Sequence, residues 1–249
     1  MHINTHTQWS DRMGRNMEFR VYGTGGRPMM IFPCQSGRYF DWEGQGMVDI
    51  AQPWIDAGKL QLFCVDSIDP ESWDCPGGDL PTRMEMHEKW YDYLTQEFYP
   101  LMIQLNGGEN WGKVITSGSS MGGYHAVNFF LRRPDLFNGV ISLSGLFSME
   151  MFIGKYMDDI AYRNDPLTYM ANLPEDHHYI SLFNNADPLI ICVGQGAWED
   201  EMKESTFALR EIFDRKGIRA QWEIWGHDVN HDWPWWRIQW PMFLSRVLD

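Results

Sequence analysis

A serine between glycines, at a point where a strand is expected to give way to a helix, is the residue best placed to act as a nucleophile. In the stretch KVITSGSSMGGYHAVNFF, Gly118 and Gly122 stand two positions before and two after Ser120. This G-x-S-x-G spacing is typical of a sharp strand-to-helix turn, because small residues let the strand and the helix pass closely. Ser117 and Ser119 are rival serines, but only Ser120 is centred between the glycines. We therefore predict Ser120 as the nucleophile.

Two other interpretations of the same segment are weaker. The serines could merely cap a helix after a glycine-rich turn. A phosphate-binding loop is disfavoured because the G-K-[ST] ending of that motif is absent. In the nucleophile interpretation, Met121 is the first residue of the helix. Its backbone N–H can donate to an oxyanion that develops beside Ser120.

A serine hydroxyl needs a base to take its proton, and two histidines compete for that role. The last expected strand, QWEIW, runs into GHDVNHDWPWWR, which contains His227 and His231. Enzymes built around such a serine turn carry the histidine after their last strand. His227 directly follows Gly226 and could help to form the turn, so placement favours His231 as the base.

The same segment could be considered as a metal site formed by His227, Asp228, His231 and Asp232. Two histidines four positions apart suit a metal ion only when they share a helix face. Gly226 and Asn230 indicate a loop instead, so we predict neither a metal ion nor any other cofactor.

The carboxylate that orients the histidine should follow the preceding strand, in the stretch CVGQGAWEDEMKEST. Glu199, Asp200 and Glu201 are adjacent there, and Asp187 lies just before the strand. Acidic residues at a helix start can simply favour the helix dipole. Glu199 is the first acid after the strand and its glycines, and we predict it as the orienting residue, with Asp200 as the alternative.

The loop in MMIFPCQSGRYFDW should supply the second oxyanion donor. The backbone N–H of Gln35 is the predicted donor, and that of Cys34 is the alternative. Cys34 could itself be considered as a nucleophile, but no helix directly follows it.

Aromatic and methionine side chains crowd the loops around these residues, and most of them should belong to the core. We predict that a few line a substrate pocket. The candidates are Trp198, Trp233 and Phe147 as apolar walls, and Arg38 as a contact for a polar substrate group, although solvation is the more ordinary role of a surface arginine.

These residues must be positioned by alternating strands and helices. Strands are expected over 17–22, 28–32, 60–65, 113–116, 139–143, 189–193 and 221–225. Helices are expected over 46–57, 84–104, 121–133, 200–216 and 233–248, with Pro241 kinking or splitting the last. Several strands are almost continuously apolar, as in parallel sheets that are covered on both faces. We therefore predict an α/β fold with a mostly parallel central sheet and helices on both faces.

One region breaks this alternation. Between about residues 146 and 186 the pattern is irregular and punctuated by Asp-Pro, Leu-Pro and Asn-Asn pairs. A structureless loop of that length is uncommon in a compact domain. We predict one domain over residues 1–249, with a small lid-like insertion near 146–186.

Charge limits the classes of partner. The 249 residues carry a formal net charge of −14, which disfavours nucleic acid and anionic membranes. The N-terminal stretch lacks the apolar core of a signal peptide, and no later run is long enough for a membrane span. We expect a cytoplasmic protein, and exposed Trp and Met side chains near the insertion could serve an interface between copies of the chain.

Three segments together resemble the Putative esterase family of the α/β-hydrolase fold. They are G-S-S-M-G-G at Gly118–Gly123, H-D-W-x-W-W-R at His231–Arg237 and, more loosely, the G-Q-G-A-W-E stretch that ends at Glu199. The family includes S-formylglutathione hydrolases, enterochelin esterases, feruloyl and acetyl-xylan esterases and mycolyltransferases. The resemblance implies Ser120 as nucleophile, Glu199 as acid and His231 as base. One departure is Pro33-Cys34-Gln35, where the family usually has His-Gly or Asp-Gly.

The residues and the resemblance together predict a serine esterase. It would cleave a small or medium carboxylic ester, or a thioester, through an acyl-enzyme. Two alternatives stay open: acyl transfer to an alcohol or amine with the same triad, and a non-catalytic binding protein on a hydrolase fold.

Overall fold

One sheet of eight strands organises the molecule, whose computed structural model describes residues 1–107 and 114–249. The strand order across the sheet is β1-β2-β4-β3-β5-β6-β7-β8. The strands are β1 (Ile3–Ser10), β2 (Arg15–Tyr22), β3 (Arg27–Phe32), β4 (Leu60–Val65), β5 (Val114–Ser119), β6 (Phe137–Leu143), β7 (Leu189–Val193) and β8 (Gln221–Ile224). From β4 to β8 all neighbours are parallel, so the predicted α/β class with a mostly parallel sheet is confirmed.

The strand β1 is the one element of the sheet that the sequence does not predict. It forms an antiparallel hairpin with β2, and β2 in turn runs antiparallel to β4. Most side chains of β1 are exposed because the strand lies at the edge of the sheet, so it carries no apolar run. The expected strand over 113–116 is found as β5, although its first residue, Lys113, lies outside the described residues.

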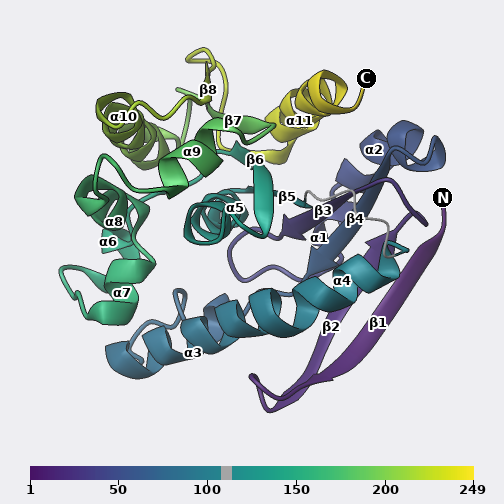
Figure 1. Ribbon diagram of the computed structural model, residues 1–249, viewed down its shortest axis with the longest axis horizontal. Helices are drawn as coiled ribbons and strands as arrows, with labels where there is room; N and C mark the ends of the chain where they lie inside the picture. The colour runs from purple at the N-terminus through teal and green to yellow at the C-terminus, as the bar shows by residue number, and fades with distance from the viewer. Residues whose placement is uncertain (108–113) are drawn as a thin grey trace.

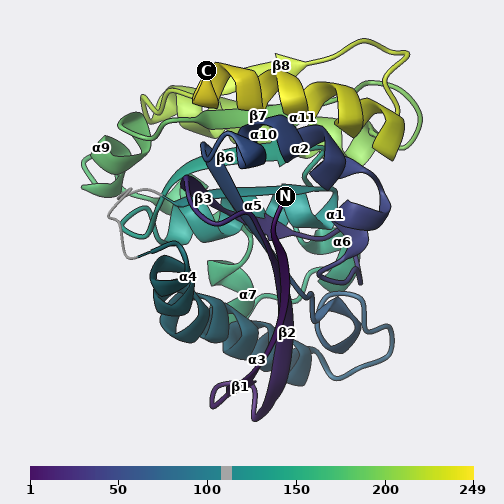
Figure 2. The same cartoon turned by 90° about the vertical axis from the view of Figure 1, so that its right-hand side faces the viewer.

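Helices cover both faces of the sheet, as the sequence predicts (Figures 1 and 2). One face packs against α1 (Asp41–Gly44), α2 (Met47–Asp56) and α11 (Trp233–Leu248). The other packs against α3 (Leu80–Asp92), a π-helical turn η2 (Tyr93–Phe98), α4 (Tyr99–Leu105), α5 (Met121–Arg132) and α10 (Asp200–Arg215).

Alternation along the strands divides the core between these faces. Met30 and Phe32 of β3 belong to the cluster under α5, whereas Met29 and Ile31 belong to the cluster under α2 and α11. Every second side chain points to the same face of a sheet. A strand that is buried on both faces, such as β3, therefore carries apolar side chains at successive positions.

Two helices differ from the predicted ones. The predicted helix over 84–104 begins earlier, at Leu80, because the Asp79 side chain caps it by accepting the Thr82 N–H. The last helix, α11, continues through Pro241 and is not split. Trp240 and Phe243, on either side of the proline, are fully buried and hold both halves against the sheet.

The segment between β6 and β7, whose sequence pattern is irregular, contains helices in the structure. It forms four short helices, α6 (Glu150–Ile153), α7 (Asp159–Arg163), α8 (Pro166–Asn172) and α9 (Tyr179–Asn184), which lie on the left of Figure 1. Side chains of Asp158 and Asp165 cap α7 and α8. Such short helices leave little periodicity in the sequence, so only the interruption of the strand–helix alternation was visible.

No helix within residues 1–107 and 114–249 combines the length and the apolar character that crossing a membrane requires.

Candidate active site

The turn from β5 into α5 places Ser120 in a conformation that side-chain-bearing residues rarely adopt. Its backbone φ is +57° and ψ is −125°. A Cβ on Gly118 would lie 2.4 Å from the carbonyl carbon of Gly122, and a Cβ on Gly122 would lie 2.3 Å from the carbonyl oxygen of Phe32. Both positions therefore require glycine, and the tight turn leaves the Ser120 side chain at its apex.

His231 connects Ser120 to Glu199. Its Nε2 lies 2.8 Å from Ser120 Oγ, and its Nδ1 lies 3.3 Å from Glu199 Oε2. The rival histidine, His227, is exposed on the loop after β8. The structure therefore brings together the three side chains that the sequence selects, from the loops after β5, β7 and β8, and the carboxyl ends of parallel strands explain why these loops meet.

Glu199 is fully buried and well supplied with donors. Its Oε1 accepts the Ser144 hydroxyl at 2.6 Å and the Gly194 N–H at 3.3 Å, while Oε2 faces His231. Asp200, the alternative acid, is exposed and pairs with Lys203. A carboxylate held by these donors can fix the orientation of the imidazole that faces it.

Ser144 is a site residue that the sequence does not reveal. It follows β6, and its hydroxyl accepts the Trp236 indole N–H at 3.1 Å while donating to Glu199. Its contact with Glu199 spans 55 positions in the sequence, and no motif surrounds it.

Two backbone amides border the same site. Gln35 and Met121 both line the pocket that contains Ser120. Within the described parts of the chain, neither amide donates a hydrogen bond to another residue. Free N–H groups beside a nucleophile are suited to stabilise negative charge on a carbonyl oxygen.

Cys34 is poorly suited to be a nucleophile. Loss of solvent around its thiol raises its pKa to about 12, so the thiol stays protonated near neutral pH. Its Sγ lies 3.4 Å from Ser119 Oγ. The thiol thus packs beside the neighbouring serine rather than lining the pocket.

The pocket beside Ser120 has a volume of about 190 Å³ and mostly apolar walls. Beyond Ser120, His231, Ser144 and the two amide-bearing residues, its lining is Leu146, Met151, Phe152, Trp198 and Met202. Trp198, predicted from the sequence, is 78% exposed at the rim and has a φ of +67°. Leu146, Met151 and Met202 were not predicted, because loop and helix residues near the site carry no pattern that says which of them face it.

Three predicted pocket residues lie elsewhere. Phe147 is fully buried in the core cluster beneath α5, so its neighbour Leu146 faces the pocket instead. Trp233 packs edge-on against Trp236 at the start of α11. Arg38 forms ion pairs with Asp66 and Glu18, because the loop after β3 turns its side chain toward carboxylates at the end of β4 and on β2.

A metal ion finds no ready site in the described ranges 1–107 and 114–249, where no three His, Cys, Asp or Glu side chains are grouped to hold one.

Comparisons with known proteins give a family and a fold. The family model described as Putative esterase matches residues 10–244, whereas no curated protein matches the sequence.

Among solved structures, a ferulic acid esterase is 16% identical with a TM-score of 0.76, covering 99% of this chain and 98% of that chain. The fluorophosphonate-binding serine hydrolase F of Staphylococcus aureus is 16% identical with a TM-score of 0.69, covering 100% and 98%. An S-formylglutathione hydrolase from Agrobacterium tumefaciens is 15% identical with a TM-score of 0.70, covering 99% and 95%. At such identities these structures share the fold.

Proposed function

This chain belongs to the Putative esterase family of α/β-hydrolases, and we propose that it hydrolyses carboxylic esters through an acyl-enzyme formed on Ser120. The observation that supports this proposal most is the 2.8 Å distance between His231 Nε2 and Ser120 Oγ, with Glu199 on the other imidazole nitrogen. A nucleophile, a base and a residue that orients the base are the minimum for this chemistry.

The first half of the reaction transfers the acyl group to the enzyme. Ser120 Oγ attacks the ester carbonyl carbon while His231 Nε2 takes the hydroxyl proton. The carbonyl oxygen becomes an oxyanion, which the Met121 and Gln35 amides stabilise. The bond to the leaving oxygen, or to the sulfur of a thioester, then breaks as His231 returns the proton to it.

The second half releases the acid. A water molecule enters in place of the alcohol, and His231 takes a proton from it as it attacks the acyl carbon. A second oxyanion collapses, the bond to Ser120 Oγ breaks, and His231 reprotonates the serine. Glu199 orients the imidazole and stabilises the imidazolium that forms in each half.

The pocket favours an acyl or alcohol group of modest size. Its walls include Met151, Phe152, Trp198 and Met202, and no lysine or arginine is among its described lining residues. Flat aromatic and flexible methionine side chains suit an apolar or aromatic substrate group. We propose a small or medium ester, or a thioester, as the substrate class.

Labelling and turnover together test this proposal. A fluorophosphonate probe should label one serine, Ser120, and p-nitrophenyl acetate should release p-nitrophenol. The Ser120→Ala variant should lose both signals while keeping its melting temperature within a few degrees. A folded wild type that neither reacts with the probe nor cleaves any of a panel of acyl esters would instead favour a binding protein.

A further inference from the structure

A second buried histidine–carboxylate pair lies beside the site, between His125 and Asp69. His125 Nε2 lies 3.1 Å from Asp69 Oδ1, and both side chains are almost completely enclosed. His125 belongs to α5, the helix that begins after Ser120, and Asp69 begins the short helix η1 (Asp69–Glu71). The pair therefore links the nucleophile helix to a different loop at the same end of the sheet.

The other oxygen of Asp69 holds the loop that carries Gln35. Its Oδ2 accepts the Ser36 backbone N–H at 3.0 Å. Ser36 has a φ of +56° in a turn that is closed by a hydrogen bond of 2.9 Å from the Gly37 N–H to the Cys34 carbonyl oxygen. That third turn position favours glycine when φ is positive. A serine there needs an external contact to keep the peptide in this orientation.

A neighbouring carboxylate strengthens the same contact. Asp74 Oδ2 accepts the Ser36 hydroxyl at 2.6 Å, and the Asp74 N–H donates to the Asp69 carbonyl oxygen at 2.7 Å. Hydrogen bonds from the Ser36 and Gln35 side chains lower the pKa of Asp74, which keeps it an acceptor. Both donors of Ser36 are thus held by acids.

These contacts fix the peptide units on either side of Gln35. The unit before it is held through the Cys34 carbonyl oxygen, and the unit after it through the Ser36 N–H. The N–H and C=O of a trans peptide point in opposite directions. The direction of the Gln35 N–H is therefore set by the turn, and Gln35 lines the Ser120 pocket.

We propose that Asp69 and His125 are positioning residues that hold the Gln35 amide as the second oxyanion donor. Through them, the loop that carries Gln35 is connected to α5, the helix that begins after Ser120. The inference rests on the proposed function, since it assumes that an oxyanion forms beside Ser120.

A role for His125 in proton transfer does not fit its surroundings. Aromatic rings enclose it, with centroids 4.8 Å away at Trp90, 5.0 Å at Tyr124 and 5.8 Å at Phe32. Its Nδ1 has no hydrogen-bond partner among the described residues. The imidazole can thus orient Asp69, but it has no path to a substrate.

The first experiment compares Asp69→Leu with Asp69→Asn. Leucine has nearly the shape of aspartate but cannot accept the Ser36 N–H, whereas the amide oxygen of asparagine can. We expect Asp69→Leu to lower kcat for p-nitrophenyl acetate by about 100-fold with little change in KM, because an oxyanion donor acts in the transition state. Asp69→Asn should keep kcat within about tenfold of the wild type.

Affinity for a trifluoromethyl ketone separates positioning from general destabilisation. This inhibitor adds to the serine and places an oxyanion in the hole, so its affinity should fall by the same factor as kcat. The control is Asn106→Ala, which removes hydrogen bonds to Gly26 and Gln61 at the opposite end of the sheet. It should lower the melting temperature and leave both kcat and inhibitor affinity unchanged.

A second pair of variants keeps the inference testable if Asp69→Leu does not fold. His125→Gln retains an N–H near the position of Nε2, whereas His125→Phe fills the space without a donor. We expect kcat to fall at least tenfold more in His125→Phe than in His125→Gln.

Three outcomes overturn the inference. The first is that Asp69→Leu and His125→Phe both fold and keep wild-type kcat, a result that leaves the proposed function intact. The second is that their kcat and inhibitor affinity fall no further than those of Asn106→Ala at an equal loss of melting temperature. A wild type that no fluorophosphonate labels would overturn the proposed function and the inference together.

Discussion

Two histidine–carboxylate pairs with similar N···O distances lie at the same end of the sheet, and their surroundings differ. His231 and Glu199 are 3.3 Å apart, and His125 and Asp69 are 3.1 Å apart. The His231 side chain is 15% exposed and its second nitrogen meets the Ser120 hydroxyl, whereas the His125 side chain is 0% exposed and its second nitrogen meets no polar atom of the described chain. The pairing alone therefore does not define a catalytic base.

Access to a substrate therefore determines whether such a pair can act in catalysis. A base must reach both the nucleophile and the leaving group during one cycle. His231 borders the pocket and satisfies this condition, whereas aromatic rings surround His125. We therefore expect substitutions in the two pairs to affect kcat for different reasons and by different amounts.

The largest expected contrast is between His231→Gln and His125→Gln. Loss of the base should lower kcat for p-nitrophenyl acetate by on the order of 10⁵- to 10⁶-fold, because members of such a triad act as a unit. His125→Gln should stay within about tenfold, since an N–H still faces Asp69. Steady-state kinetics on folded variants would measure both, and equal losses of kcat would contradict the different roles assigned to His231 and His125.

Glu199→Gln should have the next largest effect. A glutamine can donate an N–H toward His231 Nδ1 and so hold the wrong tautomer, which should lower kcat by about 10³- to 10⁴-fold. Burst kinetics with p-nitrophenyl acetate would show slow acylation. A loss below tenfold would mean that His231 does not depend on this carboxylate.

Ser144→Ala should have a moderate effect, and Ser117→Ala offers a closely matched control. Each serine hydroxyl is buried and accepts a tryptophan indole N–H at 3.1 Å, but Ser144 donates to Glu199 whereas Ser117 donates to the Ile141 carbonyl oxygen. Losing a charge-assisted hydrogen bond of about 1.5–3 kcal/mol should lower kcat by roughly 10- to 100-fold in Ser144→Ala. Ser117→Ala should reduce the free energy of unfolding without lowering kcat. Similar kcat values in the two variants would contradict the role of Ser144.

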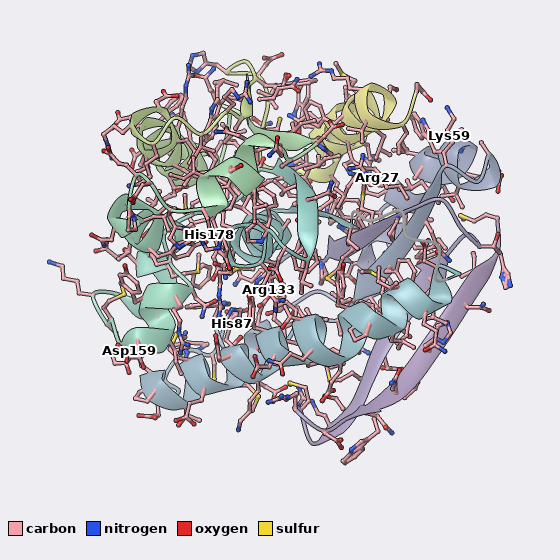
Figure 3. All side chains as sticks on the ribbon, in the orientation of Figure 1. Arg27, Lys59, His87, Arg133, Asp159 and His178 are labelled. Atoms are coloured by element: carbon pink, nitrogen blue, oxygen red, sulfur yellow. The ribbon has the colours of Figure 1, made fainter. Side chains whose placement is uncertain are left out.

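The smallest expected effect concerns acid stability around the enclosed pair. His87, labelled in Figure 3, stacks on His125 with ring centroids 5.7 Å apart. Desolvation, with His125 and Arg132 nearby, lowers the pKa of His87 well below its ordinary value. Below about pH 6.5 the unfolded chain then takes up a proton that the folded chain excludes. The free energy of unfolding therefore decreases as the pH is lowered, by up to about 1.4 kcal/mol per pH unit.

His87→Phe should remove this contribution. Between about pH 6.5 and 5, its free energy of unfolding in urea should depend less steeply on pH than that of the wild type. The Asn164 oxygen that faces His87 keeps its hydrogen bonds from Asn128 and Arg132 in this variant. An unchanged slope would show that His87 takes up its proton equally in both states.

The sequence predicts the parallel core of the fold well because strands that are buried on both faces consist mostly of apolar residues. The bounds of β4 and β7 are predicted to the residue from runs that are apolar throughout in β7 and apolar except for Gln61 in β4. The edge strand β1 was missed because solvent covers most of it, and polar edge residues resemble a loop.

The site was predictable only where a motif stands at the end of a strand. Ser120, His231 and Glu199 each follow a predicted strand, and the structure places them within hydrogen-bonding reach. Which of two neighbours faces a pocket depends on loop geometry, so Phe147 was chosen where Leu146 lines the wall. Contacts such as that between Asp69 and Ser36 join two irregular loops, and neither loop carries a periodic pattern.

The backbone conformation of Ser120 lowers the stability of the fold, although the proposed activity requires a serine at this position. A φ of +57° with a ψ of −125° costs a residue with a side chain about 1–3 kcal/mol, whereas glycine adopts it freely. A chain with glycine at this position would be inert as an esterase under the proposed mechanism and yet harder to unfold. Selection for thermal resistance alone would therefore tend to erase the nucleophile, and a stabilised version of this protein must gain its extra stability away from this turn.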